Sequence, residues 1–218
     1  MPHCDSCPVR STTTAAEPAV VECIDDQSWT LASRGEAVHL VALFRDPGIQ
    51  DRRSIPTVLD LRLDDKGHLR AGRNCWVGPM LRSLGALPRG LHVALDNGVR
   101  CPCPKKDCDY HERVTHCLSA TRSWLEKLRH PDGGYPGVLV CDKDLAHALA
   151  SLGQLTNGDG SVWHIPSPFV AAIGQSVHCF CRPALICPHP AVVSRSARYR
   201  VHMNEIGLAS AIRTLARL

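Results

Sequence analysis

The segment CPCPKKDCDYHERVTHC (101–117) holds four cysteines and two histidines within seventeen residues. Cysteine thiolates and imidazoles are the ligands that structural zinc prefers, usually four of them in a tetrahedron. Cys101 and Cys103 stand two positions apart, which places both on one face of a strand. His111 follows Cys108 closely, at the start of an expected helix. The spacing therefore predicts a structural zinc site formed by Cys101, Cys103, Cys108 and His111.

A second group of the same kind lies in VHCFCRPALICPHP (177–190). Here Cys179 and Cys181 form another C-x-C pair, and Cys187 and His189 follow after a short spacer. Two such groups with the same order favour zinc over the alternative, which is a set of buried cysteines without metal. The sequence thus predicts one or two structural zinc ions as the cofactor.

The order C-x-C, spacer, C-x-H in the second group resembles SWIM-type zinc fingers. The resemblance covers residues 177–190 and implies that Cys179, Cys181, Cys187 and His189 bind one zinc ion. It also implies a role in contacts with DNA or with proteins rather than in catalysis.

A different chemistry is suggested by Asn74-Cys75-Trp76, which precedes an apolar segment. A cysteine at a helix N-terminus has a lowered thiol pKa and can act as a nucleophile. These three residues resemble the nucleophile segment of viral papain-like cysteine proteases. The resemblance implies that a histidine on a later strand is the base, and the candidates are His164 and His178. The alternative for Cys75 and Trp76 is core packing.

Two further segments, LVALFRDP (40–47) and SVWHIPS (161–167), resemble segments of herpesvirus tegument proteins of the cytoplasmic-envelopment type. That resemblance implies a cysteine-rich, non-enzymatic interaction protein that acts in an infected cell. It favours an adaptor over an enzyme.

The composition fits a globular protein with an unusual supply of metal ligands. The chain has 218 residues, 44% of them hydrophobic, with 12 cysteines, 12 histidines and a net charge of +4. This mild charge permits nucleic-acid binding without requiring it. The first ten residues lack the apolar core of a secretory signal, and no apolar run is long enough for a membrane span. We therefore expect a reduced, intracellular protein, cytoplasmic or nuclear, with a protein partner.

Hydrophobic periodicity and turn residues predict a mixture of strands and helices. Asp109 and Glu112 are spaced as a capping box for a helix that ends near Arg129, with Cys117 on its apolar side or available as a ligand. The expected strands are 37–44, 57–63, 138–141, 161–165 and 169–181, with a hairpin over 91–101. Turns are expected at 64–67 and 157–160. Further helices are expected over 143–153 and 204–218. This order lacks a regular alternation of strand and helix, so it predicts an α+β fold with a mixed sheet and short helices.

The domain prediction is a flexible arm over 1–20 followed by one globular domain over 21–218, with a possible subdivision at 130–137. Neither a P-loop, nor G-x-G-x-x-G, nor H-E-x-x-H occurs in the chain, so nucleotide hydrolysis, Rossmann cofactors and zincin chemistry lack motif support. The sequence as a whole favours a zinc-containing interaction or scaffolding module. The alternative is a cysteine protease with Cys75 as nucleophile and an internal zinc module.

Overall fold

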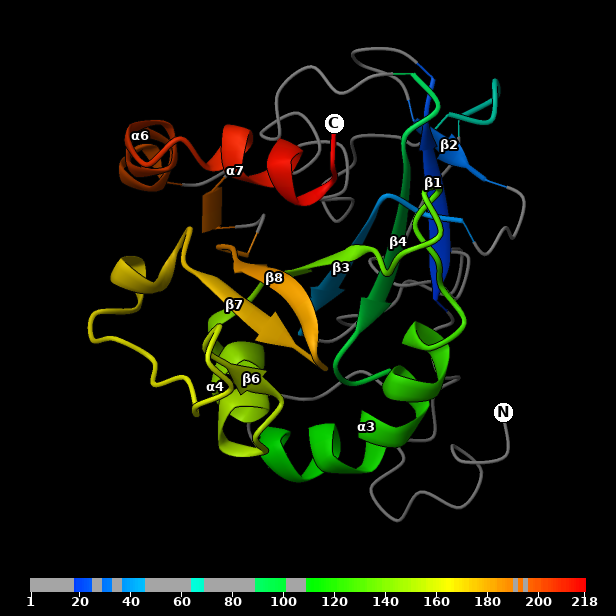
Figure 1. Cartoon of the computed structure of the whole chain (residues 1–218). Coiled ribbons are helices and arrows are strands. Elements are labelled where there is room, and N and C mark those ends of the chain that lie inside the picture. Colours follow the sequence, from blue (N-terminus) through cyan, green and yellow to red (C-terminus); the bar gives the residue numbers. More distant parts are fainter. Residues whose placement is uncertain are drawn as a thin grey trace.

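One mixed sheet forms the centre of the protein (Figure 1). The computed structural model describes residues 18–24, 29–32, 37–45, 64–68, 89–100, 109–189, 192–193 and 196–218. Its strands are β1 (Ala19–Cys23), β2 (Trp29–Leu31), β3 (Leu40–Phe44), β4 (His92–Asn97), β5 (Gly137–Val140), β6 (Leu155–Thr156), β7 (Ser176–Cys179) and β8 (Arg182–Ile186). Within the described ranges they form an eight-stranded sheet in the order β2-β1-β4-β3-β5-β8-β7-β6.

The four central strands of this sheet, β4, β3, β5 and β8, are parallel. Antiparallel pairs extend the sheet on both sides, with β1 and β2 beyond β4, and β7 and β6 beyond β8. The structure confirms an α+β fold with a mixed sheet. Because parallel strands all end on the same side, β4, β3, β5 and β8 share one edge, which we call the carboxyl edge.

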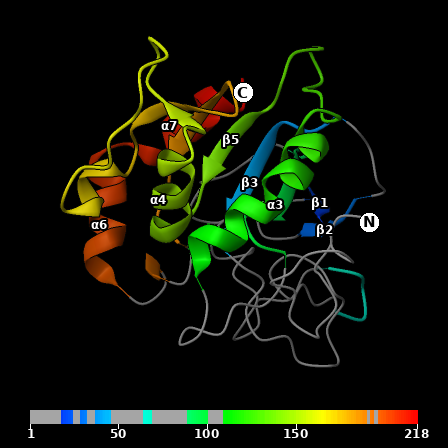
Figure 2. The same ribbon diagram turned by 90° about the horizontal axis from the view of Figure 1, so that it is seen from below.

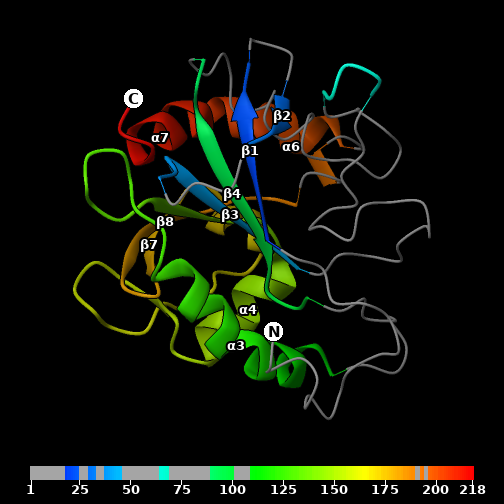
Figure 3. The ribbon, with the colours of Figure 1, turned by 90° about the vertical axis from the view of Figure 1, so that its right-hand side faces the viewer.

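Helices cover both faces of the sheet (Figure 3). The helices are α3 (Tyr110–Leu125), α4 (Lys143–Ser151), α6 (Ala197–Glu205) and α7 (Leu208–Leu215), with a 3₁₀ turn η1 (Phe169–Ala172). Helices α3 and α4 pack against each other on one face (Figure 2), and α6 and α7 cover the other. None of the helices in the described ranges is long and apolar enough to cross a bilayer.

Strand β3 shows why both faces need a cover. All five of its residues are buried, and they alternate between two cores. Leu40, Ala42 and Phe44 pack on the α6/α7 side, whereas Val41 and Leu43 pack on the α3/α4 side. A continuous apolar run is what a central parallel strand requires.

The long helix follows its predicted pattern at its start, but it ends at Leu125 rather than near Arg129. The Asp109 side chain accepts a hydrogen bond from the Glu112 N–H (3.1 Å), which caps α3. Val114 and Leu125 are buried and Cys117 is half-buried on the face toward the sheet. The prediction that Cys117 belongs to the apolar side is confirmed. The turns at 64–67 and 157–160, strand β5 and helix α4 are confirmed as well.

Several expected elements differ from the structure. The segment after β4 does not return as a hairpin: β4 runs parallel to β3, and the Gly98 N–H donates to the Phe44 carbonyl (2.7 Å) at the carboxyl edge. Residues 169–181 form η1 and then β7, and 161–165 contribute one isolated bridge. The expected C-terminal helix is divided by Gly207, whose φ of 63° ends the first helix. Strand β1 already includes Ala19 from the expected arm.

Other predictions lie outside the described residues. These are the strand over 57–63, the arm up to residue 17 and the segments around Cys75 and Cys101. They stay predictions.

Gly137 allows α7 to pack closely against β5. A Cβ at this position would lie 2.4 Å from Leu215 Cγ. We therefore expect Gly137→Ala to lower the free energy of unfolding by about 1–3 kcal/mol, as overpacking does in other cores, measured by urea denaturation. The matched control is Gly158→Ala, where a Cβ meets nothing within 4 Å. Equal stability of the two variants would contradict the close packing.

Candidate functional site

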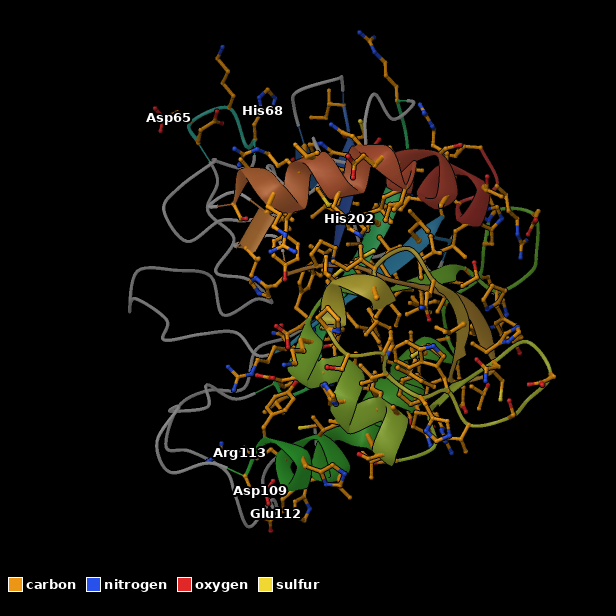
Figure 4. All side chains as sticks on the ribbon, turned by 90° about the vertical axis from the view of Figure 1, so that its left-hand side faces the viewer. Asp65, His68, Asp109, Glu112, Arg113 and His202 are labelled. Atoms are coloured by element: carbon orange, nitrogen blue, oxygen red, sulfur yellow. The ribbon has the colours of Figure 1, made fainter. Side chains whose placement is uncertain are left out.

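The first predicted zinc group lies almost wholly outside the described residues. Cys101, Cys103 and Cys108 are not described, whereas His111 is exposed on the first turn of α3. Figure 4 shows Asp109, Glu112 and Arg113 together at this end of the helix. The described residues thus place one of the four predicted ligands, and its side chain is exposed.

The second predicted group is described completely, and its four side chains do not converge. Cys179 pairs with Arg182, and Phe180 and Cys181, with φ of 51° and 62°, form the tight turn between β7 and β8. Cys187 lies at the opposite end of β8, five residues beyond Arg182, which is about 16 Å at the usual rise of a strand.

The two halves of this group also face different cores. Cys179 is buried among the residues under α3 and α4, whereas Cys187 is buried on the α6/α7 side. Cys181 is exposed on the turn, and the His189 ring packs edge-on against Phe44, with ring centroids 6.5 Å apart. Zinc ligands must all lie about 2.0–2.3 Å from the metal, so we do not propose a SWIM-type site here.

Among the residues that the structure describes, no group of three or more His, Cys, Asp or Glu side chains is arranged to hold a metal ion.

The candidate bases of the protease hypothesis are both described. His164 is exposed in the segment before η1, and His178 lies on β7 opposite Pro183. In the described part of the chain, neither imidazole is hydrogen-bonded to an aspartate or asparagine side chain that would orient it. Cys75 lies outside the described residues, so the structure does not test whether either histidine lies near this nucleophile.

Four side chains lie next to one another at the carboxyl edge: Asn97, Phe44, Cys141 and Cys187. Asn97 pairs with Phe44 in register, and Cys141 and Cys187 each follow the last paired residues of β5 and β8. Asn97 is fully buried, and both polar atoms of its amide lack a hydrogen-bond partner among the described residues. Orphaned buried amides are rare and call for an explanation, such as a bound water or ligand.

A pocket of about 410 Å³ opens beside this row. Four segments that are distant in sequence form its walls: the start of α4, η1, the segment after β8 and the start of α6. The residues with polar or aromatic groups in it are Asp142, Lys143, Phe169, His189, Arg198 and Tyr199; two prolines and two valines complete it. Ligands of open α/β sheets bind outside the carboxyl ends of parallel strands, and this pocket has that position.

The acidic and basic side chains of the pocket differ in how far they are free to contact a ligand. Asp142 caps α4 by accepting hydrogen bonds from the N–H groups of Asp144 (2.7 Å) and Leu145 (3.1 Å). Burial raises the pKa of the Asp142 carboxyl, against the opposing effect of these N–H groups. Lys143 and Arg198 are both exposed. The pocket therefore presents basic groups to solvent while its acid is engaged by the helix.

Sequence reasoning did not identify these pocket residues. Asp142 and Lys143 open α4 and carry only the signal of a helix N-terminus. Arg198 and Tyr199 belong to a short basic segment that can be recognised in the sequence, but its position beside α4 depends on the fold.

A comparison with protein-family models finds no match for this chain, and a comparison with curated proteins finds no significantly similar sequence. The function is therefore inferred from the residues and their arrangement.

Proposed function

We propose that the protein is a non-enzymatic interaction module that binds an acidic peptide segment of a protein partner in the pocket at the carboxyl edge. One observation carries this proposal: the pocket combines apolar and aromatic walls with two exposed basic side chains, Lys143 and Arg198. Its acidic residue, Asp142, is occupied by the first turn of α4.

The size and chemistry of the pocket define the peptide. About 410 Å³ is within the range of small binding pockets and accommodates a large apolar side chain with part of its backbone. Phe169 and Tyr199 offer apolar ring surface to such an anchor. Carboxylates on either side of the anchor can pair with Lys143 and Arg198, and such pairs give orientation and specificity. We therefore expect a leucine or aromatic anchor flanked by Asp or Glu.

The proposal is tested by selection from a random-peptide phage library against the full chain. We expect enrichment of peptides with an apolar anchor next to acidic residues, and loss of their binding in the double variant Lys143→Ala/Arg198→Ala. A failure to enrich such peptides, or equal binding by the double variant, would contradict the proposal. A labelled single-stranded oligonucleotide is the comparison probe; salt-sensitive binding that the double variant abolishes would assign the pocket to nucleic acid instead.

We further propose that a zinc ion bound by Cys101, Cys103, Cys108 and His111 fastens the connection between β4 and α3. Strand β4 ends at Asn97 and α3 begins at Tyr110, so all but one of these ligands belong to the short connection. His111 is exposed on the first turn of α3, which supports its role as the ligand that joins the connection to the helix.

A further inference from the structure

Cys141 and Cys187 form a contact that neither the zinc prediction nor the peptide pocket uses. They follow β5 and β8, whose last residues Val140 and Ile186 pair directly. The Cys187 N–H donates to the Val140 carbonyl (2.8 Å), which extends the register by one residue. Cys141 Sγ donates a hydrogen bond to the Leu139 carbonyl (3.8 Å), and both cysteines are free thiols.

The geometry of this pair suits a disulfide. Neighbouring strands lie about 4.8 Å apart, and disulfides join residues whose Cα atoms are roughly 4.4–6.8 Å apart. Both side chains lie in the same core on the α6/α7 side of the sheet. A bond between the two sulfurs therefore needs rotation of the side chains rather than movement of the strands.

The pair lies next to residues of the pocket at the carboxyl edge. Asp142 and Pro188, which directly follow the two cysteines, both line the pocket. Cys187 is 5% exposed and Cys141 is 1% exposed. Both thiols are therefore almost fully enclosed, and we expect a reagent as small as hydrogen peroxide to reach them more readily than a larger thiol or disulfide.

We propose that Cys141 and Cys187 are a redox-active pair that hydrogen peroxide converts to a disulfide. Cys187 Sγ attacks one peroxide oxygen, the O–O bond breaks, and the thiol proton leaves with the released hydroxide as water. This step makes a sulfenic acid on Cys187. Cys141 Sγ then attacks the Cys187 sulfur, and the sulfenic hydroxyl leaves with the Cys141 proton as a second water. Peroxide is reduced to two waters while two thiols become one disulfide.

The order of the two steps follows from the surroundings of the thiols. The hydrogen bond with Cys187, together with burial, raises the pKa of the Cys141 thiol well above its usual range. Because the thiolate is the nucleophile, Cys141 is the poorer first attacker. Cys187, which is slightly more exposed than Cys141 (5% against 1%), reacts first and Cys141 resolves the sulfenic acid.

The disulfide would join two walls of the pocket, because it links the residues that precede Asp142 and Pro188. The inference itself does not rest on peptide binding. Its readout is a covalent bond between two named cysteines, so it can fail or succeed independently of the proposed function.

The test uses the full reduced chain treated with hydrogen peroxide, then alkylated under denaturing conditions and digested. We expect mass spectrometry to find a peptide joining Cys141 to Cys187 that dithiothreitol separates. In the Cys141→Ala variant, we expect dimedone, added together with the denaturant after peroxide treatment, to trap a sulfenic acid on Cys187. The internal control is Cys179, which is fully buried under α3 and α4 and should remain an alkylatable thiol throughout.

Two results would overturn the proposal. One is full alkylation of both Cys141 and Cys187 after peroxide treatment that oxidises other cysteines. The other is oxidation of Cys179 at the same rate as the pair, because that would show that peroxide enters through general unfolding rather than reaching the pair in the folded state.

Discussion

Replacing Asp96 by alanine is expected to lower the free energy of unfolding by about 3–5 kcal/mol. Asp96 is fully buried at the end of β4. Its carboxylate accepts hydrogen bonds from Arg100 Nε (3.2 Å) and Nη2 (2.7 Å), and from the Asn97 N–H (2.8 Å). Removing the carboxylate breaks a buried ion pair by deleting one of its members, and this kind of change is costly.

The measurement is urea denaturation of wild type and variant at neutral pH. The control is Asp159→Ala, which removes a carboxylate from an exposed turn and should cost less than about 1 kcal/mol. A loss at Asp96 no larger than that at Asp159 would show that the Asp96–Arg100 pair does not fix the end of β4.

Removal of zinc is expected to have the second large effect. Structural zinc sites contribute about 10–16 kcal/mol of apparent binding free energy, which is coupled to folding. We expect the reduced protein to contain about one zinc ion per chain, as a four-ligand structural site requires. A strong chelator should remove it and lower the melting temperature, because zinc then no longer holds the connection between β4 and α3 in place.

Two variants separate the proposed site from the rest of the cysteines. Cys101→Ser/Cys103→Ser should abolish zinc binding, measured by elemental analysis. Cys181→Ser, which changes the exposed cysteine of the β7–β8 turn, should leave the zinc content unchanged. Metal-free protein after purification under reducing conditions, or loss of zinc in Cys181→Ser, would refute the assignment.

Sequence patterns predicted those elements that depend on residues only a few positions apart. The apolar run LVALF became the buried strand β3, and the spacing of Asp109 and Glu112 located the start of α3. Both follow from side-chain periodicity and capping, which depend on neighbours a few residues away.

The errors arose where distant segments decide the outcome. Asn97-Gly98 has the composition of a hairpin turn, yet β4 pairs with β3 and β1 instead of a returning strand. Likewise Cys179 and Cys187 are close in sequence, but the β7–β8 hairpin separates them and turns them to opposite faces. The order C-x-C, spacer, C-x-H does not reveal that the spacer is a strand, β8, which holds the two pairs apart.

The pocket also depends on packing between segments that are distant in the sequence. Lys143 and Arg198 are 55 positions apart in the sequence, and only the packing of α6 beside the start of α4 places them in one pocket. Their pairing could not be read from spacing: Lys143 opens a predicted helix, whereas Arg198 lies before the helix that was predicted over 204–218.

Recognition of an acidic peptide by Arg198 and its pocket can be tested with single substitutions. The most direct measurement is the dissociation constant of a selected fluorescent peptide for the wild type and for Arg198→Glu and Arg213→Glu. Both arginines are exposed, but Arg213 lies on α7 and does not line the pocket. We predict that Arg198→Glu weakens binding by at least about tenfold, or roughly 1.4 kcal/mol, and that Arg213→Glu leaves it nearly unchanged. Equal binding by all three proteins would contradict the account.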